Sequence, residues 1–291
     1  MKRRTVGRDA GLTVRMIVAL VLLASTYAGV LALCVFLVWY RPSYAWLSIS
    51  AFVALSFSFA ARYGNGAKAL LRAIGAEVRP EAADSPVRAA VGRLAALAGI
   101  PAPDVAIAET DSLNAFAVGL RRGGSTIVVT RGLVHALTAA ELEAVLAHEL
   151  SHLVNRDAAV MTAVSSPRTL GEVVVSGAGE GFGLLWLVGW PLGLFPYLIG
   201  TGLTLTVSRA REFAADRGAA VLTGNPAALM SALQKIAGHA AEIPHDDLRA
   251  ANAFCIVSTE AHRFSFLSDH PPLENRLAAL AEIQRELGRA A

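Results

Sequence analysis

Two long runs without a charged side chain lie near the start of the chain, at residues 16–40 and 42–61. As a helix the first run would extend about 37 Å, longer than the roughly 30 Å hydrocarbon core of a bilayer. The whole chain is apolar as well, with 54% hydrophobic and 17% charged residues and a mean hydropathy of +0.49. We therefore predict a transmembrane helical hairpin within residues 1–63; a helical hairpin buried in a soluble core is the alternative.

Basic residues predict the orientation of this hairpin. Five Lys or Arg residues precede it and four follow it before residue 80, whereas only Arg41 lies between the two runs. Because basic flanks stay in the cytoplasm, we expect a multi-pass protein of the inner (cytoplasmic) membrane with the rest of the chain facing the cytoplasm. The net charge is only +3 and the basic residues are dispersed, so we expect no nucleic-acid partner.

A later segment carries the pattern H-E-L-S-H at positions 148–152. Two histidines four residues apart lie on one face of a helix, where their imidazoles can supply two nitrogen ligands to a tetrahedral Zn²⁺. Glu149 can reach the open side of such a metal, hold a water molecule and take its proton. A T-x-x-E capping box at Thr138 and Glu141 predicts the start of the required helix. Two ordinary histidines on an amphipathic helix are the alternative.

The third ligand decides the class of zinc site. One large class needs a third histidine six residues after the second, and this chain has alanine there. A carboxylate from a later helix is the other common solution, and Glu212 and Asp216 stand about one helical turn apart. Glu212 can complete a site with His148 and His152, while Asp216 accepts the free ring N–H of one histidine. A mixed-charge surface helix is the alternative. Three other glutamates are weaker candidates: Glu172, Glu180 and Glu242.

The motifs HELSH, REFAAD and DHPPLENR, in this order, resemble those of the HtpX-type membrane zinc metalloproteases, which are related to the CAAX prenyl proteases. The resemblance covers most of the chain. It implies one zinc ion per chain, bound by His148, His152 and Glu212, with Glu149 as the general base. It also implies a mainly α fold with a small β-sheet (α+β), a gluzincin-like protease domain with the membrane hairpin before it.

The resemblance extends to residues outside the zinc set. His270 precedes two prolines in a stiff extended element, and it would lie at the cleft and help polarise the scissile carbonyl. Arg276 would pair with a carboxylate near the site, in a structural role beside that of Asp216. Asn114 and Ala115 would line the cleft, where an edge strand can bind an extended substrate. The alternatives are a capping histidine and an asparagine in a turn.

Local patterns place helices and strands around these motifs. Alternating and β-rich runs predict three strands, and the R-R-G-G between the last two predicts a hairpin turn. Apolar periodicity and capping signals predict a linker helix after the hairpin and helices further on. The strands are residues 104–109, 115–120 and 125–130, and the helices are residues 64–79, 86–98, 226–240 and 272–287.

The chain is thus predicted to have four parts. They are the transmembrane hairpin, a segment with the linker helix, sheet and H-E-x-x-H helix, a membrane-associated insertion, and the C-terminal half of the protease domain. In order, they are residues 1–63, 64–157, 158–208 and 209–291.

The insertion has to return the chain to the side that it left. A single crossing would place Glu212 opposite His148 and His152, where it could not bind the same metal. We therefore expect the insertion to cross twice, to re-enter, or to lie against the protein. Its two arms would meet at a break at residues 177–183 or near 191–196.

These features together predict a membrane-anchored zinc endopeptidase that cleaves unfolded or membrane-associated proteins on the cytoplasmic side. The resemblance implies a role in protein quality control and the stress response. The expected partners are polypeptide substrates and the lipid bilayer, and a homo-oligomer stays open. The alternatives are a CAAX-type processing protease and a catalytically silent zinc-binding membrane scaffold. Glu149 has no evident use in such a scaffold.

Overall fold

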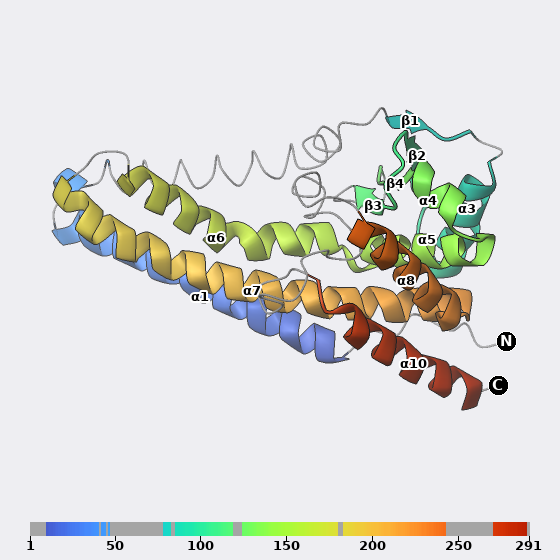
Figure 1. Cartoon of the computed structure of the whole chain (residues 1–291). Coiled ribbons are helices and arrows are strands. Elements are labelled where there is room, and N and C mark those ends of the chain that lie inside the picture. The colour runs from blue at the N-terminus through green and yellow to red at the C-terminus, as the bar shows by residue number, and fades with distance from the viewer. Residues whose placement is uncertain are drawn as a thin grey trace. The chain divides into compact units, whose positions relative to one another are not determined.

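The structure is a computed structural model that describes residues 10–40, 42–44, 46, 78–82, 85–118, 124–179, 183–242 and 270–289. The chain divides into two compact units, which are taken separately below (Figure 1). The first unit consists of Met1–Asp9, Ala67–Ala159 and Ser208–Ala291, and the second of Ala10–Gly66 and Val160–Val207. The two long helices α6 (Asp157–Gly179) and α7 (Gly183–Thr223) each have residues in both units.

A four-stranded mixed sheet forms part of the first unit, with the strand order β1-β2-β4-β3. β2 and β4 are parallel, and each outer strand is antiparallel to its neighbour. β4 is buried along most of its length, and β3 forms one edge of the described sheet. In chain order the strands are β1 (Val78–Pro80), β2 (Asp104–Ala108), β3 (Ala115–Val118) and β4 (Thr126–Thr130).

The three predicted strands are confirmed: β2 and β4 are each one residue shorter than expected, and the described part of β3 ends at Val118. The linker helix predicted over residues 64–79 is wrong at its end, because Val78 and Arg79 belong to β1. Pairing of β1 with β2 overrides the local helical pattern, and the Glu81 amide extends it by a 2.8 Å hydrogen bond to the Val105 carbonyl. Residues 64–77, the last two residues of the strand predicted over 115–120, and residues 121–123 of the turn predicted over 121–124 lie outside the described residues.

Helix α5 (Ala139–Asn155) is the central helix of the first unit. It packs against α3 (Pro86–Ala98), α8 (Pro226–Glu242) and strand β3. The predicted capping box is present, with Thr138 and Glu141 bonding to each other's backbone and side chain. Nearly every side chain from the middle of α5 to its last turn is buried, so the helix is fixed on several sides.

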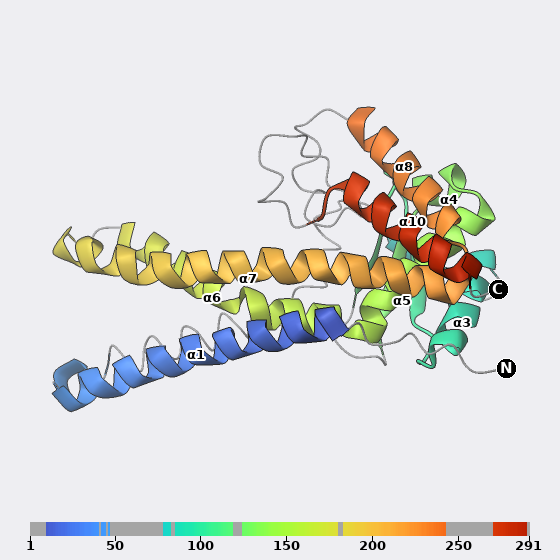
Figure 2. The same ribbon diagram turned by 90° about the horizontal axis from the view of Figure 1, so that it is seen from below.

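The C-terminal helices complete this core. α10 (Leu273–Arg289) packs along α8, as Figure 2 shows from below, and buries Arg276, Leu280 and Ile283. The predictions for residues 226–240 and 272–287 are therefore confirmed to within two residues at each end. The short helix α4 (Arg131–Ala136) follows β4 directly and is capped by Thr130.

The described part of the second unit consists of helices. Its described elements are α1 (Ala10–Tyr40), the short η1 (Pro42–Tyr44), most of α6 (Asp157–Gly179) and the first part of α7 (Gly183–Thr223). The change from α6 to α7 falls within the first predicted break, whereas α7 continues as a helix past positions 191 and 196. Among the described residues, no helix is long and apolar enough to span a membrane.

Glycines allow α6 and α7 to pack closely. A Cβ atom at Gly171 would lie 2.5 Å from the Gly193 carbonyl oxygen, and one at Gly200 would lie 2.2 Å from the Arg168 amide nitrogen. At this contact the Arg168 guanidinium lies 5.8 Å from the centre of the Tyr197 ring and pairs with Glu172 at 3.1 Å. The charges that weaken the apolar pattern of α6 are therefore paired.

Candidate metal centre

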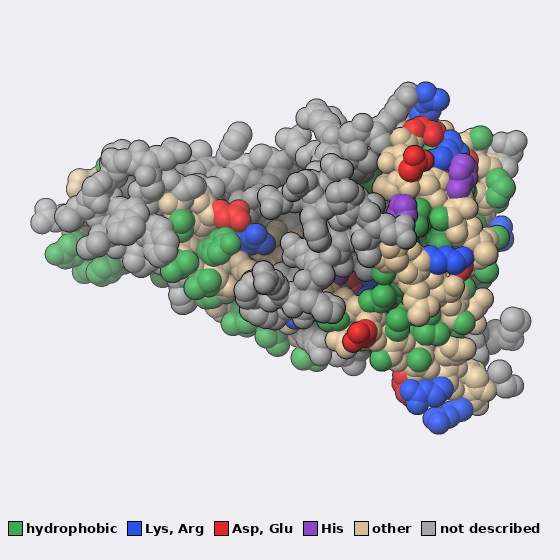
Figure 3. Space-filling view, viewed as in Figure 1, with side chains coloured by type: hydrophobic (Ala, Val, Ile, Leu, Met, Phe, Trp, Pro, Cys, Tyr) green, Lys and Arg blue, Asp and Glu red, His purple; other side chains and the backbone are tan. Residues whose placement is uncertain are grey.

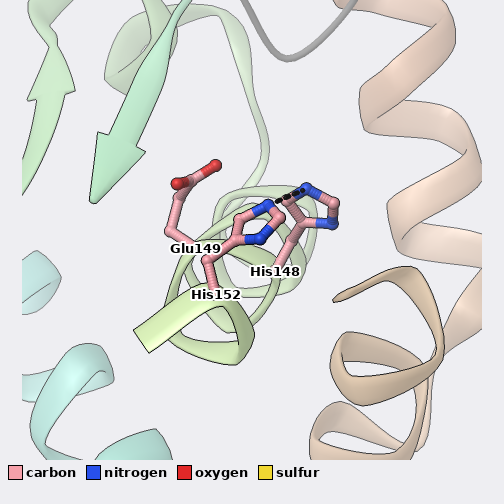
Figure 4. A group of neighbouring side chains, drawn as sticks. All are labelled: His148, Glu149 and His152. Atoms are coloured by element: carbon pink, nitrogen blue, oxygen red, sulfur yellow. Dashed lines mark hydrogen bonds between the residues drawn. The ribbon is translucent and has the colours of Figure 1, made fainter. Parts of the chain in front are cut away.

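Helix α5 brings two histidine rings together at its buried end. The Nε2 atoms of His148 and His152 lie 3.2 Å apart, and the rings are perpendicular (Figure 4). One ligand atom from each of His148, Glu149 and His152 lies within 4.8 Å of the others. The four-residue spacing therefore places both Nε2 atoms at one point, as predicted from the helix period.

Glu212 on α7 approaches the same point. Its Oε2 atom lies 3.5 Å from Nε2 of His148, and its Oε1 atom lies 3.8 Å from Nε2 of His152. The side chain is only 5% exposed, and no described residue donates a hydrogen bond to Oε2. Burial raises the pKa of Glu212, but the neighbouring histidines and Arg276 outweigh it and hold the pKa well below its usual range. A buried anionic oxygen thus faces two imidazole nitrogens.

Asp216 and Arg276 support the first histidine. Asp216 Oδ1 lies 3.0 Å from Nδ1 of His148, on the side of the ring opposite Nε2. Arg276 on α10 donates two hydrogen bonds to this carboxylate, from Nε at 2.8 Å and from Nη2 at 2.6 Å. Burial raises the pKa of Asp216, but the charge of Arg276 and its hydrogen bonds outweigh burial and lower the pKa below its usual value. The sequence analysis expected Asp216 and Arg276 to support the zinc ligands, and the structure places both on the Nδ1 side of His148.

A second carboxylate supports His152, and the sequence analysis gave it no role. Asp157 Oδ2 lies 2.5 Å from Nδ1 of His152, and Arg211 Nε lies 3.1 Å from the same oxygen. Arg156 adopts a left-handed conformation with φ of 59° and ends α5. Asp157 is the next residue along the chain. The available signals were an acid just past the helix end and a basic residue directly before Glu212.

Glu149 lies on the side of α5 that faces β3 (Figure 4). Its carboxyl is buried and interacts with the backbone of Ala117 in that strand. Burial raises the pKa of Glu149, and the opposing effect of His152 and His148 does not cancel it. A carboxyl with a raised pKa is suited to exchanging protons near neutral pH.

His270 reaches the site from the segment before α10. Its Nδ1 atom lies 3.5 Å from Glu212 Oε1, and its side chain is 16% exposed.

Burial lowers the pKa of His148, but its contacts with Asp216 and Glu212 raise it to about 9. The site therefore holds several acidic and basic groups within contact distance of Glu212.

The two residues predicted to line the cleft are both buried at the start of β3. The backbone amide of Asn114 donates to Thr130 Oγ1 at 2.9 Å. The hydroxyl and the backbone amide of Thr130 donate to the backbone carbonyl of Asn114 at 2.8 and 3.0 Å. Ala115 is 1% exposed. These bonds fix where the edge strand begins, and contact with a substrate stays a prediction for both residues.

The donor set fits a tetrahedral zinc ion. Two nitrogens that are each ~2.0–2.1 Å from a tetrahedral zinc are about 3.3–3.4 Å apart, close to the 3.2 Å observed. The buried Glu212 oxygen is a third donor of the type that zinc accepts. Two histidines, a third acidic donor and an adjacent glutamate define a metalloprotease centre of the H-E-x-x-H class.

Comparison with known proteins agrees with this class. Residues 81–284 match the model of Peptidase family M48. The chain is 39% identical to "Protease HtpX homolog 2" of Methanosarcina mazei, over 99% of this chain and 100% of that protein. It is 40% identical to "Protease HtpX homolog" of Moorella thermoacetica, over 98% of each. The chain belongs to peptidase family M48, and the resemblance to HtpX-type proteases is confirmed.

A solved structure shares the fold. The crystal structure of S. mikatae Ste24p aligns with a TM-score of 0.51 and 19% identity, covering 94% of this chain and 66% of that one. At this identity the likeness concerns the fold alone. It agrees with the mainly helical architecture and small mixed sheet described above.

Proposed function

We propose that this chain is a zinc-dependent endopeptidase that holds one zinc ion through His148, His152 and Glu212. The buried Glu212 carboxylate, directed at two Nε2 atoms 3.2 Å apart, is the observation that carries the proposal. Arg276 Nη1 lies 3.5 Å from Oε2 of this carboxylate, but Oε2 accepts no hydrogen bond from a described residue. Burial of a charge is costly, and a cation at this point offsets that cost. Asp216 and Arg276 support the ligands from behind.

In this proposal Glu149 is the general base. When bound, zinc supplies Lewis acidity that polarises a peptide carbonyl and acidifies a water molecule. Glu149 takes a proton from the attacking water and passes it to the leaving amine. Its raised pKa and its position facing β3 favour both transfers. His270 would polarise the carbonyl oxygen or stabilise the oxyanion, and its position 3.5 Å from Glu212 supports this role.

The edge strand β3 is the proposed substrate-binding element. It packs against α5, and the backbone of its residue Ala117 interacts with Glu149. An extended polypeptide can pair with such an edge through main-chain hydrogen bonds, which tolerate many sequences. Asn114 and Ala115 set where this strand begins. This mode suits unfolded or membrane-associated proteins and therefore protein quality control and the stress response.

Attachment to the cytoplasmic membrane is the second part of the proposal. Large apolar side chains of α1 recur every three or four residues and are exposed, among them Val14, Ile17, Val21, Val35 and Trp39. Hydrophobic side chains also gather on the left in Figure 3, where Figure 1 shows α1, α6 and α7. A continuous exposed apolar face of this kind is rare in soluble proteins. It supports the proposal that residues 1–63 and 158–208 contact lipid. The basic residues that flank residues 16–61 support the further proposal that the catalytic part lies in the cytoplasm.

Two measurements test these two parts. The purified full-length chain should contain one zinc per chain and cleave unfolded casein, and a zinc-loaded chain that cleaves nothing would favour a scaffold or a narrowly specific processing protease. In cells, alkaline carbonate should leave the chain in the membrane pellet. Its release into the supernatant would contradict insertion of residues 1–63.

A further inference from the structure

Both histidines direct Nε2 at the candidate metal position, so the rotation of each imidazole ring has to be restricted. Rotation of an imidazole about its second side-chain torsion is only weakly restricted by the helix itself. For His148 the control comes from Asp216 and Arg276, with contacts of 3.0 and 2.6 Å. His152 lies in the last turn of α5 and is more exposed than His148, so it needs support from outside the helix.

Asp157 provides that support at the shortest polar contact of the described site. Its Oδ2 atom lies 2.5 Å from Nδ1 of His152, so the ring presents Nε2 to Glu212 and His148. Asp157 is buried and is the first residue of α6. The left-handed Arg156 before it turns the chain back toward the histidine. The carboxylate is thus placed by the junction of two helices.

Arg211 holds this carboxylate from a third helix. Its Nε atom lies 3.1 Å from Asp157 Oδ2, and its side chain is largely buried. Arg211 directly precedes Glu212 on α7, so one short stretch of helix carries both a candidate ligand and the support of another. The arrangement is similar to that on the other side of the site, except that Arg211 contacts its aspartate as an ion pair and its Nε makes no hydrogen bond, whereas Arg276 donates two. His148, Asp216 and Arg276 form one His–Asp–Arg chain, and His152, Asp157 and Arg211 form the second.

We propose that Asp157 and Arg211 are a positioning pair for His152. Asp157 fixes the ring so that Nε2 faces the metal, and Arg211 acts through Asp157. The inference rests on the proposed zinc site and adds two residues that hold its geometry without touching zinc or substrate. Outer-shell partners of this kind typically change metal affinity by about 10–100-fold when removed.

The test measures zinc affinity of the full-length protein by competition with a chromogenic chelator. Asp157→Ala should weaken zinc binding by about 10–100-fold. Arg211→Ala should weaken zinc binding less than Asp157→Ala does. The double variant should bind zinc as weakly as Asp157→Ala alone. The control is Arg217→Ala, which removes another arginine of α7 whose partner, Glu286, is at the surface. It should leave zinc affinity unchanged.

A second variant keeps the test decisive if Asp157→Ala does not fold. Asp157→Asn has the same size and retains an oxygen that can accept from Nδ1 of His152, but it loses the ion pair with Arg211. Its zinc affinity should lie between those of the parent and Asp157→Ala. In the cobalt-substituted protein, the visible absorption bands should differ between Asp157→Asn and the parent and stay the same in Arg217→Ala.

Two results would overturn the pair. One is a folded Asp157→Ala or Asp157→Asn protein with the zinc affinity and cobalt spectrum of the parent. The other is an Arg211→Ala effect of equal size with and without Asp157, which would mean that Arg211 acts independently. A parent protein that binds no zinc would instead overturn the proposed function itself, so the two failures are distinguishable.

Discussion

His148 and His152 hold their Nε2 atoms 3.2 Å apart, and both rings are held through Nδ1 by a buried aspartate. The nitrogen pair is therefore oriented by protein contacts on the Nδ1 side of each ring. Preorganised ligands favour tight binding because little ordering is needed when the ion enters. The third donor, Glu212, comes from another helix, so the site also links α5 to α7.

Replacing Glu212 with Gln should remove bound zinc from the purified protein. The charge that balances the cation is lost, and the weakening should exceed the roughly 100-fold that outer-shell changes reach. Metal content by atomic absorption after dialysis measures this. Glu286→Gln, an exposed glutamate paired with Arg217, is the control and should retain zinc. Full zinc content in Glu212→Gln would exclude Glu212 as a ligand.

Arg276→Ala should destabilise the fold by about 3–5 kcal/mol, because it leaves Asp216 buried without its cation. Chemical denaturation of the metal-free protein in detergent measures the change in the free energy of unfolding. Arg285→Ala lies on the same helix, where Arg285 pairs with Glu282 at the surface. It should change the free energy by less than about 1 kcal/mol. Equal effects of the two variants would mean that the buried ion pair contributes no more to the free energy of unfolding than the surface pair.

Acid should weaken the junction between α5 and α8 through Glu141. Burial raises the pKa of this carboxyl, but hydrogen bonds from Lys235, Ser231 and Thr138 outweigh it and lower the pKa to about 2. The stabilisation is therefore present above the ordinary value of 4.5 and is lost as the pH falls toward 2.

As the pH is lowered through this range, the unfolding temperature should thus decrease more steeply in the parent than in Glu141→Gln. Glu143→Gln, an exposed change on the same helix, is the control and should follow the parent. Parallel pH profiles of the parent and Glu141→Gln would contradict the coupling of Glu141 to α8.

Much of the site could be predicted because its signals are local. The capping box, the histidine spacing and the Glu212–Asp216 spacing each lie within one helix, where the helical period fixes which side chains share a face. Asp157 was missed because it lies beyond the end of α5. Only the left-handed Arg156 turns it back, and no periodic pattern indicates such a turn.

Long-range pairing explains the other difference in the fold. Val78–Pro80 forms a strand because β2 is there to pair with it, and that information lies about 25 residues away in the chain. Likewise the parallel pairing of β2 with β4 depends on the chain between them and not on either strand's own sequence. By contrast, Pro86–Ala98 was predicted to the residue, since Ser85 and Pro86 mark its start locally.

Gly200→Ala should disturb the packing of α6 against α7, because the new Cβ would lie 2.2 Å from the Arg168 amide nitrogen. Forced overpacking costs about 1–3 kcal/mol. Gly202→Ala is the matched control, two residues further along α7, where a Cβ meets no atom within 4 Å. It should be neutral or stabilising, since alanine favours helices over glycine by up to about 1 kcal/mol. Thermal unfolding in detergent compares the two, and an equally stable Gly200→Ala would contradict the close contact.

The most direct test of the central claim compares casein cleavage by the purified, zinc-loaded protein with cleavage by Glu149→Gln carrying the same amount of zinc. Loss of a general base typically costs about 10²–10⁴-fold in rate, so the parent should cleave and the variant should show almost no turnover. Equal cleavage by both proteins, at equal zinc content, would contradict the assignment of Glu149 as the base.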